Sequence, residues 1–489
     1  MKTHLILASS LASLVCALSV EAADLTAIWQ PAEAGSFSWE IPASWSGSVV
    51  PNNTTTPSVN NYYANITISN GAQVISTSRA LTLSRMNLAV SGSASLRLVL
   101  GGDLTILDSG FTSTTKTAIS NITSSAANLE IDLNGHRFLA NNYLGNSTIQ
   151  TASFYTISSS VAGGVFALQQ ASYNGANAVQ VMNNVTVRLS YNGAQDLRGW
   201  RFADGSTLQM APASTTQSNL TYLPTTGVAN LLIGDASQSS KSTSTLVGDA
   251  RVRGDVKVLS YAGAVGGAAS ELKFYATTGK LYVGGDFIDE GTDGFNYGAG
   301  TLILDGAAGR TQKLSIGRTG LSTHVQIGDT VSGAPSAEVM LERNLTTTGN
   351  LRITANGTLD LQSFTASAGL VRLDDGSELI LALDATSGHL ISLGNLTVDD
   401  FTLHLDGDGG NWTSGDDLLL FEYAGSLSGS LNLVSVDADF NLTYDGLYND
   451  AANGRVYLKN IALIPEPGVA WCMGGGALLL TTLCRRRKA

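Results

Sequence analysis

The sequence predicts an all-β protein folded as a right-handed parallel β-helix, or β-solenoid, and three observations lead to this prediction. Only 13% of the 489 residues are charged, whereas 53 residues are glycine. Short strands of the type apolar-x-apolar alternate with Gly-bearing turns along the chain. In the C-terminal half, these strands recur with a constant shift, which carries position 351 to 371 and position 359 to 379.

The composition favours strands over helices. The charged fraction is about half of the usual share, and small hydroxyl and amide residues stand between short apolar runs. Amphipathic helices would need Glu, Lys and Ala on their solvent-facing sides, whereas short strands and tight turns need small polar residues and glycine. The length fits two or three ordinary domains or one long repetitive domain, so the periodicity has to decide between them.

Two neighbouring segments show the repeat directly. LRITANGTLDL (351–361) and VRLDDGSELIL (371–381) superimpose from end to end without a gap. The matched positions are Leu351 and Val371, Arg352 and Arg372, Ile353 and Leu373, Leu359 and Leu379, and Leu361 and Leu381. Each unit reads as two short strands joined by a turn such as Asn356-Gly357 or Asp375-Gly376.

The same shift extends the pattern in both directions. It places Val339 and Leu341 one repeat earlier, and Ile391 and Leu393 one repeat later. A constant period is what a solenoid requires, because each apolar position must stack on its counterpart in the next coil. A β-sandwich also has alternating strands, but nothing in a sandwich imposes a constant shift. Roughly 20 coils, spaced about 4.8 Å apart, would form a rod on the order of 100 Å long.

Similar strands occur upstream with less regular spacing. They include Leu96, Leu98 and Leu100; Leu104 and Ile106; Leu129, Ile131 and Leu133; and Leu281 and Val283. These stretches resemble the autotransporter-associated strand repeats and passenger-type β-helices of surface proteins. Trp29, Trp39 and Trp45 are expected to cover the first exposed coil within an N-terminal cap at 23–60, or alternatively to stack on sugar rings.

The body is predicted to be one domain, 23–463. No charge run or Pro-rich linker divides it. The constant register slips after Asn395, so 396–463 is predicted to form a C-terminal cap, because terminal repeats must present a solvated face.

The N-terminus reads as a secretory signal peptide, 1–22. One lysine precedes an apolar stretch, and Val20-Glu21-Ala22 fits a small-x-Ala site with cleavage after Ala22 or Ala23. The signal would form the N-terminal helix of the uncut chain and direct it to the Sec export machinery. A lipoprotein signal at Cys16 fits less well, because Ser13 and Val15 stand where a leucine and a small residue are needed.

The last residues, 464–489, combine Pro465-Glu466-Pro467, an uncharged run 468–484 and four cations. As a helix, the run spans about 26 Å, near the lower limit for crossing a bilayer core of about 30 Å. The cations Arg485, Arg486, Arg487 and Lys488 would stay on the cytoplasmic side, which leaves the body outside that membrane. A buried core helix would fit these cations and Gly474-Gly475-Gly476 badly.

This ending resembles the PEP-CTERM sorting tail of bacterial exported proteins. The resemblance covers the tail alone, 464–489, and matches the family in the order and spacing of its three parts. It implies an exosortase, a membrane cysteine protease-transpeptidase, as the processing partner, and an association with exopolysaccharide production. The protein would then lie in the inner membrane before processing, and at the cell surface or in the extracellular matrix afterwards. Physically, the two prolines keep the recognition site extended and accessible to a protease.

Charge and cysteine content narrow the possible partners. Without the lysine and Glu21 of the signal and without the four tail cations, 22 basic and 38 acidic residues remain, a net charge of −16. Nucleic acid is therefore excluded as a partner, since phosphate binding needs a basic surface. The cysteines are Cys16, Cys472 and Cys484, so the exported body contains none and must be stabilised by its core.

No local motif points to catalysis or to a cofactor. The sequence lacks G-x-S-x-G, H-E-x-x-H, the Walker phosphate loop and G-x-G-x-x-G. The mature chain has four isolated histidines without metal-ligand spacing, namely His136, His324, His389 and His404. Neither a catalytic residue nor a metal site is predicted.

The acidic residues are the main candidates for catalysis, because β-helical polysaccharide hydrolases and lyases use clustered carboxylates, often with Ca²⁺. The pairs are Asp374 and Asp375, Asp399 and Asp400, Asp406 and Asp408, and Asp416 and Asp417. Most of them adjoin glycine, where Asp is an ordinary turn residue. The stretch from Asp406 to Asn411 resembles a calcium loop but lacks its third acid and its terminal Glu, so structural Ca²⁺ stays an alternative to turn chemistry.

The sequence thus predicts an exported, non-enzymatic surface or matrix protein with a structural or adhesive role, in contact with extracellular polysaccharide. The alternative is a β-helix polysaccharide lyase or glycoside hydrolase. That alternative predicts that acids converge in a groove midway along the rod, together with an arginine such as Arg352 or Arg372.

Overall fold

The computed structural model describes most of the body of the chain. The described residues are 23–53, 60–107, 119–120, 128–140, 155–168, 179–190, 194–212, 219–239, 241–261, 270–274, 279–291, 294–295, 298, 300–306, 309–318, 321–331, 333–383, 388–407, 412–438 and 441–464. The predicted signal helix and the predicted transmembrane helix lie outside these residues.

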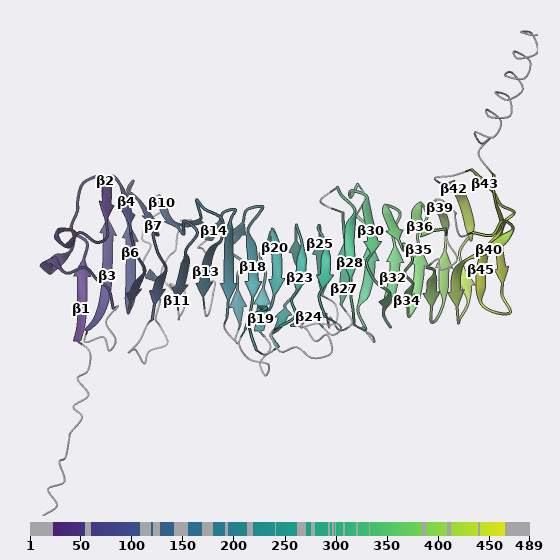
Figure 1. The fold of residues 1–489 in the computed structure, drawn as a ribbon, viewed down its shortest axis with the longest axis horizontal. Coiled ribbons are helices and arrows are strands. Elements are labelled where there is room, and N and C mark those ends of the chain that lie inside the picture. Colours follow the sequence, from purple (N-terminus) through teal and green to yellow (C-terminus); the bar gives the residue numbers. More distant parts are fainter. Residues whose placement is uncertain are drawn as a thin grey trace, which may run out of the picture.

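The described chain forms a β-solenoid, drawn out as a rod in which the strands run across the long axis and successive coils follow one another from end to end (Figure 1). One sheet of fifteen strands extends along most of the rod. Its strands are β5 (Leu81–Leu83), β8 (Leu104–Ile106), β11 (Arg137–Ala140), β13 (Gly164–Leu168), β15 (Val185–Leu189), β18 (Thr207–Met210), β20 (Asn230–Ile233), β23 (Val256–Val258), β26 (Phe287–Asp289), β28 (Gln312–Ser315), β30 (Ala337–Leu341), β33 (Gly357–Asp360), β36 (Ser377–Ala382), β39 (Asp400–Asp406) and β42 (Asn432–Ala438).

Shorter sheets form the other faces. In the N-terminal half they are a four-stranded sheet and a seven-stranded sheet, which we call the N-terminal sheet. The four-stranded sheet contains β1 (Ala23–Ile28), β3 (Asn60–Ile68), β6 (Arg85–Val90) and β9 (Ile119–Ser120). The N-terminal sheet contains β2 (Gly35–Ser38), β4 (Ala72–Ser76), β7 (Ser95–Val99), β10 (Asn128–Asp132), β12 (Tyr155–Ser158), β14 (Val179–Val181) and β17 (Arg201–Phe202). Two 3₁₀ helices, Pro42–Ser44 and Ser46–Ser48, lie near the N-terminal end.

Three further sheets follow. A second four-stranded sheet contains β16 (Gln195–Asp196), β19 (Asn219–Tyr222), β21 (Thr243–Leu246) and β24 (Glu271–Phe274). An eight-stranded sheet contains β22 (Ala250–Val252), β25 (Lys280–Val283), β27 (Thr301–Leu304), β29 (His324–Ile327), β32 (Asn350–Ile353), β35 (Leu370–Leu373), β38 (Leu396–Val398) and β41 (Leu427–Ser428). The last contains β31 (Leu345–Thr346), β34 (Ala366–Ala368), β37 (Leu390–Ser392), β40 (Asp416–Tyr423), β45 (Arg455–Leu463), β43 (Leu442–Thr443) and β44 (Gly446–Asp450).

The predicted stacking is confirmed where the repeat was read. Leu351 pairs with Val371 and Leu359 pairs with Leu379 on adjacent parallel strands. The turn before β36 is the predicted Asp375-Gly376, and Gly376 has a φ of +83°, a conformation that favours glycine. Among the described strands, every ladder that joins two members of the set β1 to β42 is parallel, which excludes an antiparallel β-sandwich.

One part of the repeat prediction is wrong. Val371 stacks on Leu396 and not on Ile391, because the coil that begins at β35 is longer than the coil before it. Ile391 instead belongs to β37, which pairs with β34 on another face, and Leu393 is 55% exposed.

Variable coil length also corrects the expected number of coils. The coil between the in-register partners Leu359 and Leu379 is short, whereas the coil between Leu104 and Phe138 is much longer. The extra residues lie in the connections between strands, where they lengthen a coil without changing the spacing between layers. The fifteen strands of the long sheet therefore replace the roughly 20 coils expected from a uniform period, and they span about 70 Å at about 4.8 Å per strand.

The core is a column of apolar side chains inside the coils. Residues alternate between inward and outward positions, so Val339, Leu359, Leu379 and Leu403 project inward from successive strands and are fully buried. Each such side chain contributes about 1.5–3 kcal/mol through burial. The predicted inward residues upstream, such as Leu96, Ile131 and Leu281, are also at most 1% exposed.

The N-terminal end is closed by three tryptophans. Trp39 and Trp45 are at most 1% exposed, and their ring centroids lie 4.7 Å apart. Trp29 packs edge-on against Trp45 at 4.9 Å and donates a hydrogen bond from Nε1 to Oε1 of the buried Gln73. With their ring faces covered, these side chains close the core and offer no stacking surface for a sugar, which corrects the alternative suggested by the sequence.

The segment predicted as the C-terminal cap, 396–463, contains two kinds of structure. Its first part continues the parallel coils, since β38, β39 and β40 pair in parallel with β35, β36 and β37. Its second part is antiparallel: β45 pairs with β40, β43 and β44. We call β43, β44 and β45 the terminal hairpin set.

A cavity in the stacked column should weaken the rod. Replacing Leu359 by Ala removes a fully buried side chain from between two coils, so we expect a loss of about 2–5 kcal/mol in the free energy of unfolding. Val331→Ala, at a position 64% exposed, should change it by less than about 0.5 kcal/mol. Guanidinium unfolding followed by circular dichroism measures both, and equal effects would contradict the stacking.

Candidate functional site

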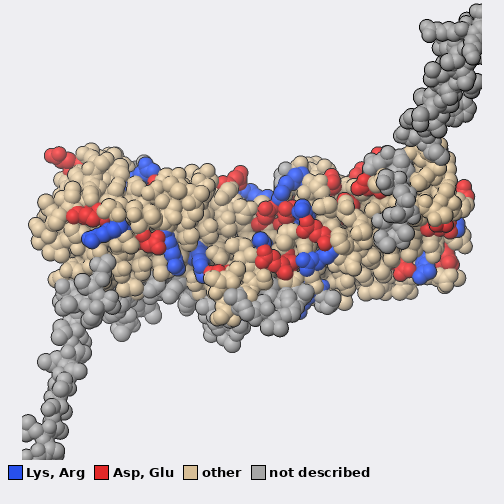
Figure 2. Space-filling view, viewed as in Figure 1, with Lys and Arg blue, Asp and Glu red and all other residues tan. Residues whose placement is uncertain are grey.

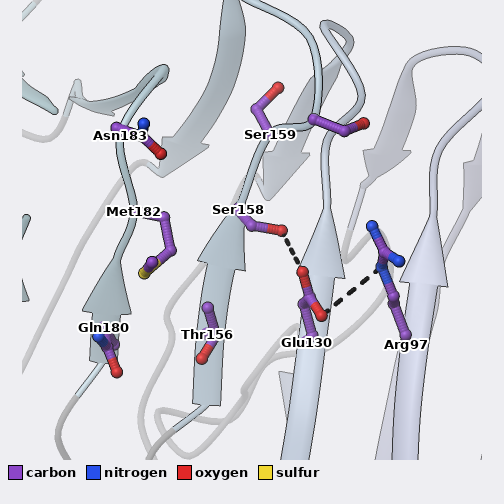
Figure 3. Close-up of a pocket in the computed structure, with 9 residues that line it drawn as sticks. Arg97, Glu130, Thr156, Ser158, Ser159, Gln180, Met182 and Asn183 are labelled. Carbon is purple, nitrogen blue, oxygen red and sulfur yellow. Dashed lines mark hydrogen bonds and ion pairs between the residues drawn. The ribbon is translucent and has the colours of Figure 1, made fainter. Parts of the chain in front are cut away.

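Four strands of the N-terminal sheet place polar side chains in one outward row. Arg97 of β7 is in register with Glu130 of β10, Glu130 with Thr156 of β12, and Thr156 with Gln180 of β14. Each of the four is flanked on both sides by buried apolar residues, so the two-residue period of the strand turns the polar residue outward. Figure 3 shows the four side chains on four neighbouring strands.

A shallow groove of about 400 Å³ lies over this row. Its lining residues are Arg97, Glu130, Thr156, Ser158, Ser159, Ser160, Gln180, Met182 and Asn183. Hydroxyl and amide groups dominate the lining, and both donors and acceptors of hydrogen bonds are present. We call this depression the polar groove.

The charges in the polar groove pair with one another. Nη2 of Arg97 lies 2.7 Å from Oδ2 of Asp132, and Nε of Arg97 lies 3.6 Å from Oε2 of Glu130. The hydroxyl of Ser158 donates to Oε1 of Glu130 at 2.5 Å (Figure 3). One arginine thus holds two carboxylates, and the glutamate is fixed from both sides.

Asp132 is held in its ionised form. Its side chain is 1% exposed, and burial alone would raise the pKa of its carboxyl. The backbone N–H groups of Ser160 and Asn134, together with Arg97, outweigh burial, so the net pKa lies below the ordinary value. A general acid must retain a proton near neutral pH, and this carboxyl does not favour one. The arrangement is suited to holding a ligand by hydrogen bonds.

A second depression of about 420 Å³ lies further along the rod. It is lined by Asp204, Gly205, Ala229, Asn230, Arg251, Arg253 and Gly254. Arg251 pairs with Asp305 at 2.5 Å and lies over the ring of Tyr282, 4.6 Å from its centroid. Arg253 donates to Asp204 and to the carbonyl oxygen of Phe202. Both cations are therefore engaged within the chain.

The densest group of charged side chains lies near the middle of the face shown in Figure 2. Ion pairs also link neighbouring parts of the long sheet: Arg310 pairs with Asp255 and with Asp286, and Lys313 pairs with Glu342 at 2.7 Å. These pairs join side chains from different coils, and all their members but Asp286 are at least 33% exposed, so each contributes little to stability.

The two arginines named by the enzyme alternative do meet a carboxylate. Nη2 of Arg352 lies 2.7 Å from Oδ2 of Asp374, and Nε of Arg372 lies 2.6 Å from Oδ1 of the same residue. Both carboxylate oxygens are thus occupied by guanidinium groups. Asp375 is exposed in the turn that follows.

The other predicted acid pairs are spread over separate places. Asp400 accepts a hydrogen bond from Ser430 at 2.6 Å, and Asp399 is half-buried nearby. Asp417 pairs with Lys459, and Asp416 is exposed. Asp406 ends β39, whereas Asp408 and Asn411 of the suggested calcium loop lie outside the described residues.

Asp360 has a raised pKa. Burial is the main cause, and the charges of Asp406 and Glu338 add to it, while hydrogen bonds from Gln362 act in the opposite direction. The Gln362 amide nitrogen and backbone N–H donate to the two carboxylate oxygens at 2.5 and 2.9 Å. Asp360 therefore belongs to a local turn, and it lines neither depression described above.

The four histidines lie apart from one another. His324 accepts a hydrogen bond at Nδ1 from the backbone N–H of Asn350, and His136 approaches Asp103 at 3.9 Å. His389 approaches Glu422 and His404 approaches Asp437. Burial lowers the pKa of His389, partly offset by Glu422. Over the described ranges, no group of three or more His, Cys, Asp or Glu side chains is placed to hold a metal ion.

The predicted sorting and cleavage residues fall at or beyond the edges of the described fold. Ala23 is the first residue of β1, and Ala22 lies outside the described residues. Also outside them are Pro465, Glu466, Pro467, Arg485, Arg486, Arg487 and Lys488. Within the part of the chain that is described, no helix is long and apolar enough to span a bilayer.

No protein-family model matches the chain, and no curated protein matches it either.

Sequence reasoning missed the polar groove, although a signal for it exists. Its strands read Leu-Arg-Leu, Leu-Glu-Ile, Tyr-Thr-Ile and Val-Gln-Val, each with one polar residue between two apolar ones. The polar residues are unevenly spaced along the chain, so no constant shift superimposes them. The triplets predict which residues point outward, but only the coil lengths show that the four lie side by side.

The ion pair beneath the groove should make stability depend on pH. The pKa of Asp132 is lowered in the folded chain, so its contribution is complete above the unfolded value of 3.8 and is lost as pH falls towards the folded value. We expect Asp132→Asn to lower the thermal midpoint at pH 7, with the deficit shrinking below about pH 4. Asp204→Asn, at a side chain 92% exposed, is the control. A deficit independent of pH would contradict this assignment.

Proposed function

We propose that the chain is an exported, non-enzymatic surface or matrix protein whose rod contacts extracellular polysaccharide, with the polar groove as one contact site. The observation that carries this proposal is the outward row of Arg97, Glu130, Thr156 and Gln180 along adjacent coils. A linear polysaccharide lying along the rod would meet hydrogen-bonding groups at intervals of about 4.8 Å. Many weak polar contacts of this kind suit adhesion.

The charge of the groove favours a neutral glycan. Arg97 is offset by Glu130 and Asp132, so the local charge is negative, as is the charge of the whole body. A polyanion such as a uronate polymer would be repelled at long range. Neutral sugars instead present hydroxyl groups that can exchange hydrogen bonds with Ser158, Gln180 and Asn183.

Binding accounts for the groove better than hydrolysis does. A glycosidase needs one carboxyl that retains a proton and a second that is free to act as base or nucleophile. Asp132 has a lowered pKa, and Glu130 is engaged by Arg97 and Ser158. The rival assignment, a β-helix lyase or hydrolase, is judged by whether the purified body degrades any polysaccharide.

The proposal includes export and sorting. The N-terminal signal would be cut after Ala22 or Ala23, and a cut after Ala22 leaves β1 (Ala23–Ile28) complete. At the other end, β45 finishes at Leu463, two positions before Pro465. The PEP-CTERM-like tail would hold the protein in the inner membrane through a helix at 468–484 until an exosortase-type enzyme removes it. The product is a rod at the cell surface or in the extracellular matrix.

We further propose that the coil is right-handed. Crossovers between parallel strands of one sheet are right-handed in about 98% of known cases, because the strand twist favours that path.

Processing is tested by intact-mass spectrometry of the protein recovered from its own cells. We expect a chain that starts at Ala23 or Asp24 and has lost the residues after the Pro-Glu-Pro motif. Glu466→Ala should leave the tail uncut, whereas Glu378→Ala, an exposed acid on the rod, should be processed normally. A wild-type mass that extends to Ala489 would refute the sorting proposal.

Glycan binding is tested by retention on immobilised exopolysaccharide and on neutral and acidic glycan arrays. Gln180→Ala removes one set of hydrogen bonds worth about 1 kcal/mol, so retention on a neutral glycan should fall about fivefold. Gln326→Ala makes the same change on β29, in a different sheet, and should have no effect. Arrays without binding, together with a deletion strain that aggregates normally, would refute the adhesive role.

A further inference from the structure

The C-terminal end of the coil stack leaves its core partly uncovered. Thirteen apolar side chains pack against the core while staying partly exposed, and ten of them belong to residues from Trp412 onward. On the last strand of the long sheet, β42, these are Leu433, Val436 and Ala438, which have no further coil above them. Stacking alone therefore does not complete the core at this end.

The terminal hairpin set and the residues next to its strands add exposed side chains of the same kind. Tyr444 is 39% exposed, Tyr448 is 51% exposed and Ile464 is 48% exposed. Val434, the extra residue at the register irregularity of β42, is 61% exposed. Nζ of Lys459 lies 5.3 Å from the ring centroid of Tyr448, so a cation accompanies the aromatic group. We call β42 and residues 442–464 together the C-terminal face.

The opposite end of the rod differs in one important respect. Leu25, Ile28, Ile41 and Val49 are exposed there, but the core itself is closed by the three buried tryptophans. The C-terminal face is thus the end at which core residues lack a complete cover.

The length of chain beyond this face limits what can cover it. Ile464 is the last described residue, and the uncharged run begins at Gly468. The three residues between them span about 10 Å when fully extended. If the run crosses a bilayer, Ile464, at the end of the C-terminal face, is held within that distance of the membrane surface.

The composition of the face suits such a surface. Tyrosine is enriched at the membrane interface, where its ring lies among apolar groups and its hydroxyl meets water. Transfer of isoleucine, leucine and valine side chains from water to the upper acyl region is favourable. From Trp412 to Ile464 the sequence has seven acidic and two basic residues, so a zwitterionic surface should be preferred to an anionic one.

We infer that, while the tail is uncut, the C-terminal face rests on the lipid–water interface, so that the rod stands on the membrane with its tryptophan-closed end outermost. This inference rests on the proposed anchoring by the tail. Figure 1 shows that the C-terminal strands lie at one end of the rod and β1 at the other, so docking by this face turns the long axis away from the membrane. The polar groove, built from β7 to β14, is then presented away from the membrane surface.

Photo-crosslinking to lipid tests the inference on the full chain. The protein is reconstituted in phosphatidylcholine vesicles that contain some phosphatidylcholine with a diazirine close to the headgroup, and adducts are mapped by peptide mass spectrometry. We expect adducts on peptides from 432–438 and 442–464, in addition to the tail. Exposed valines on the rod, Val161 and Val331, serve as internal controls and should remain unmodified.

A matched pair of variants separates docking from mere proximity. Val434→Asp places a charge on the C-terminal face and should reduce adducts on 432–450 at least about fivefold. Val331→Asp makes the same change at a position of similar exposure, 64% against 61%, and should leave them unchanged. Circular dichroism confirms that both variants are folded.

The outcomes distinguish the two proposals. Adducts on the tail but none on the C-terminal face would overturn docking and leave anchoring intact. That pattern, combined with crosslinks between two protein copies, would assign the face to end-to-end assembly instead. Adducts on neither region would overturn anchoring, and docking with it.

Discussion

The whole structure depends on the stacking of apolar side chains from one coil onto those of the next. Leu359 lies over Leu379 in register, and the same contact repeats along the fifteen-stranded sheet. Residues 23–463 include no cysteine, so no disulfide adds to this column. Because most described strands pair in parallel with a strand on either side, the stacking also satisfies the backbone hydrogen bonds of the strands inside each sheet. The three tryptophans close one end, whereas the other end stays partly open.

Stacking inside the rod arranges the side chains outside it. Because every second side chain of a strand points inward, the side chains between them point outward and stack in rows. Arg97, Glu130, Thr156 and Gln180 therefore become neighbours although they come from four different coils. The polar groove thus needs no dedicated loop or motif. In the same way, Arg352 and Arg372 come together on Asp374 as a consequence of register. Polar rows of this kind can bind an extended ligand without a deep pocket.

The sequence was sufficient for the fold class and for part of the register. Where coils have equal length, as between Leu351 and Val371, apolar positions could be superimposed directly. The constant shift predicts the wrong partner at Ile391, because the next coil is longer and Val371 stacks on Leu396 instead. The polar groove could not be predicted for the same reason, since its coils differ in length. The burial of Trp29, Trp39 and Trp45 could be expected in part, whereas the half-covered core at the C-terminal face could not be read from a pattern, because it depends on which strands have no neighbour.

The central claim, that coils lie one above another in register, can be measured as a distance. Val74 and Arg201 occupy the same outward row of the N-terminal sheet on strands five spacings apart. Spin labels on cysteines at these two positions, with Cys16, Cys472 and Cys484 replaced by serine, should give a narrow double electron–electron resonance distribution at about 24 Å. A broad distribution centred well beyond that distance would contradict the stacked rod, and with it the groove and the C-terminal face.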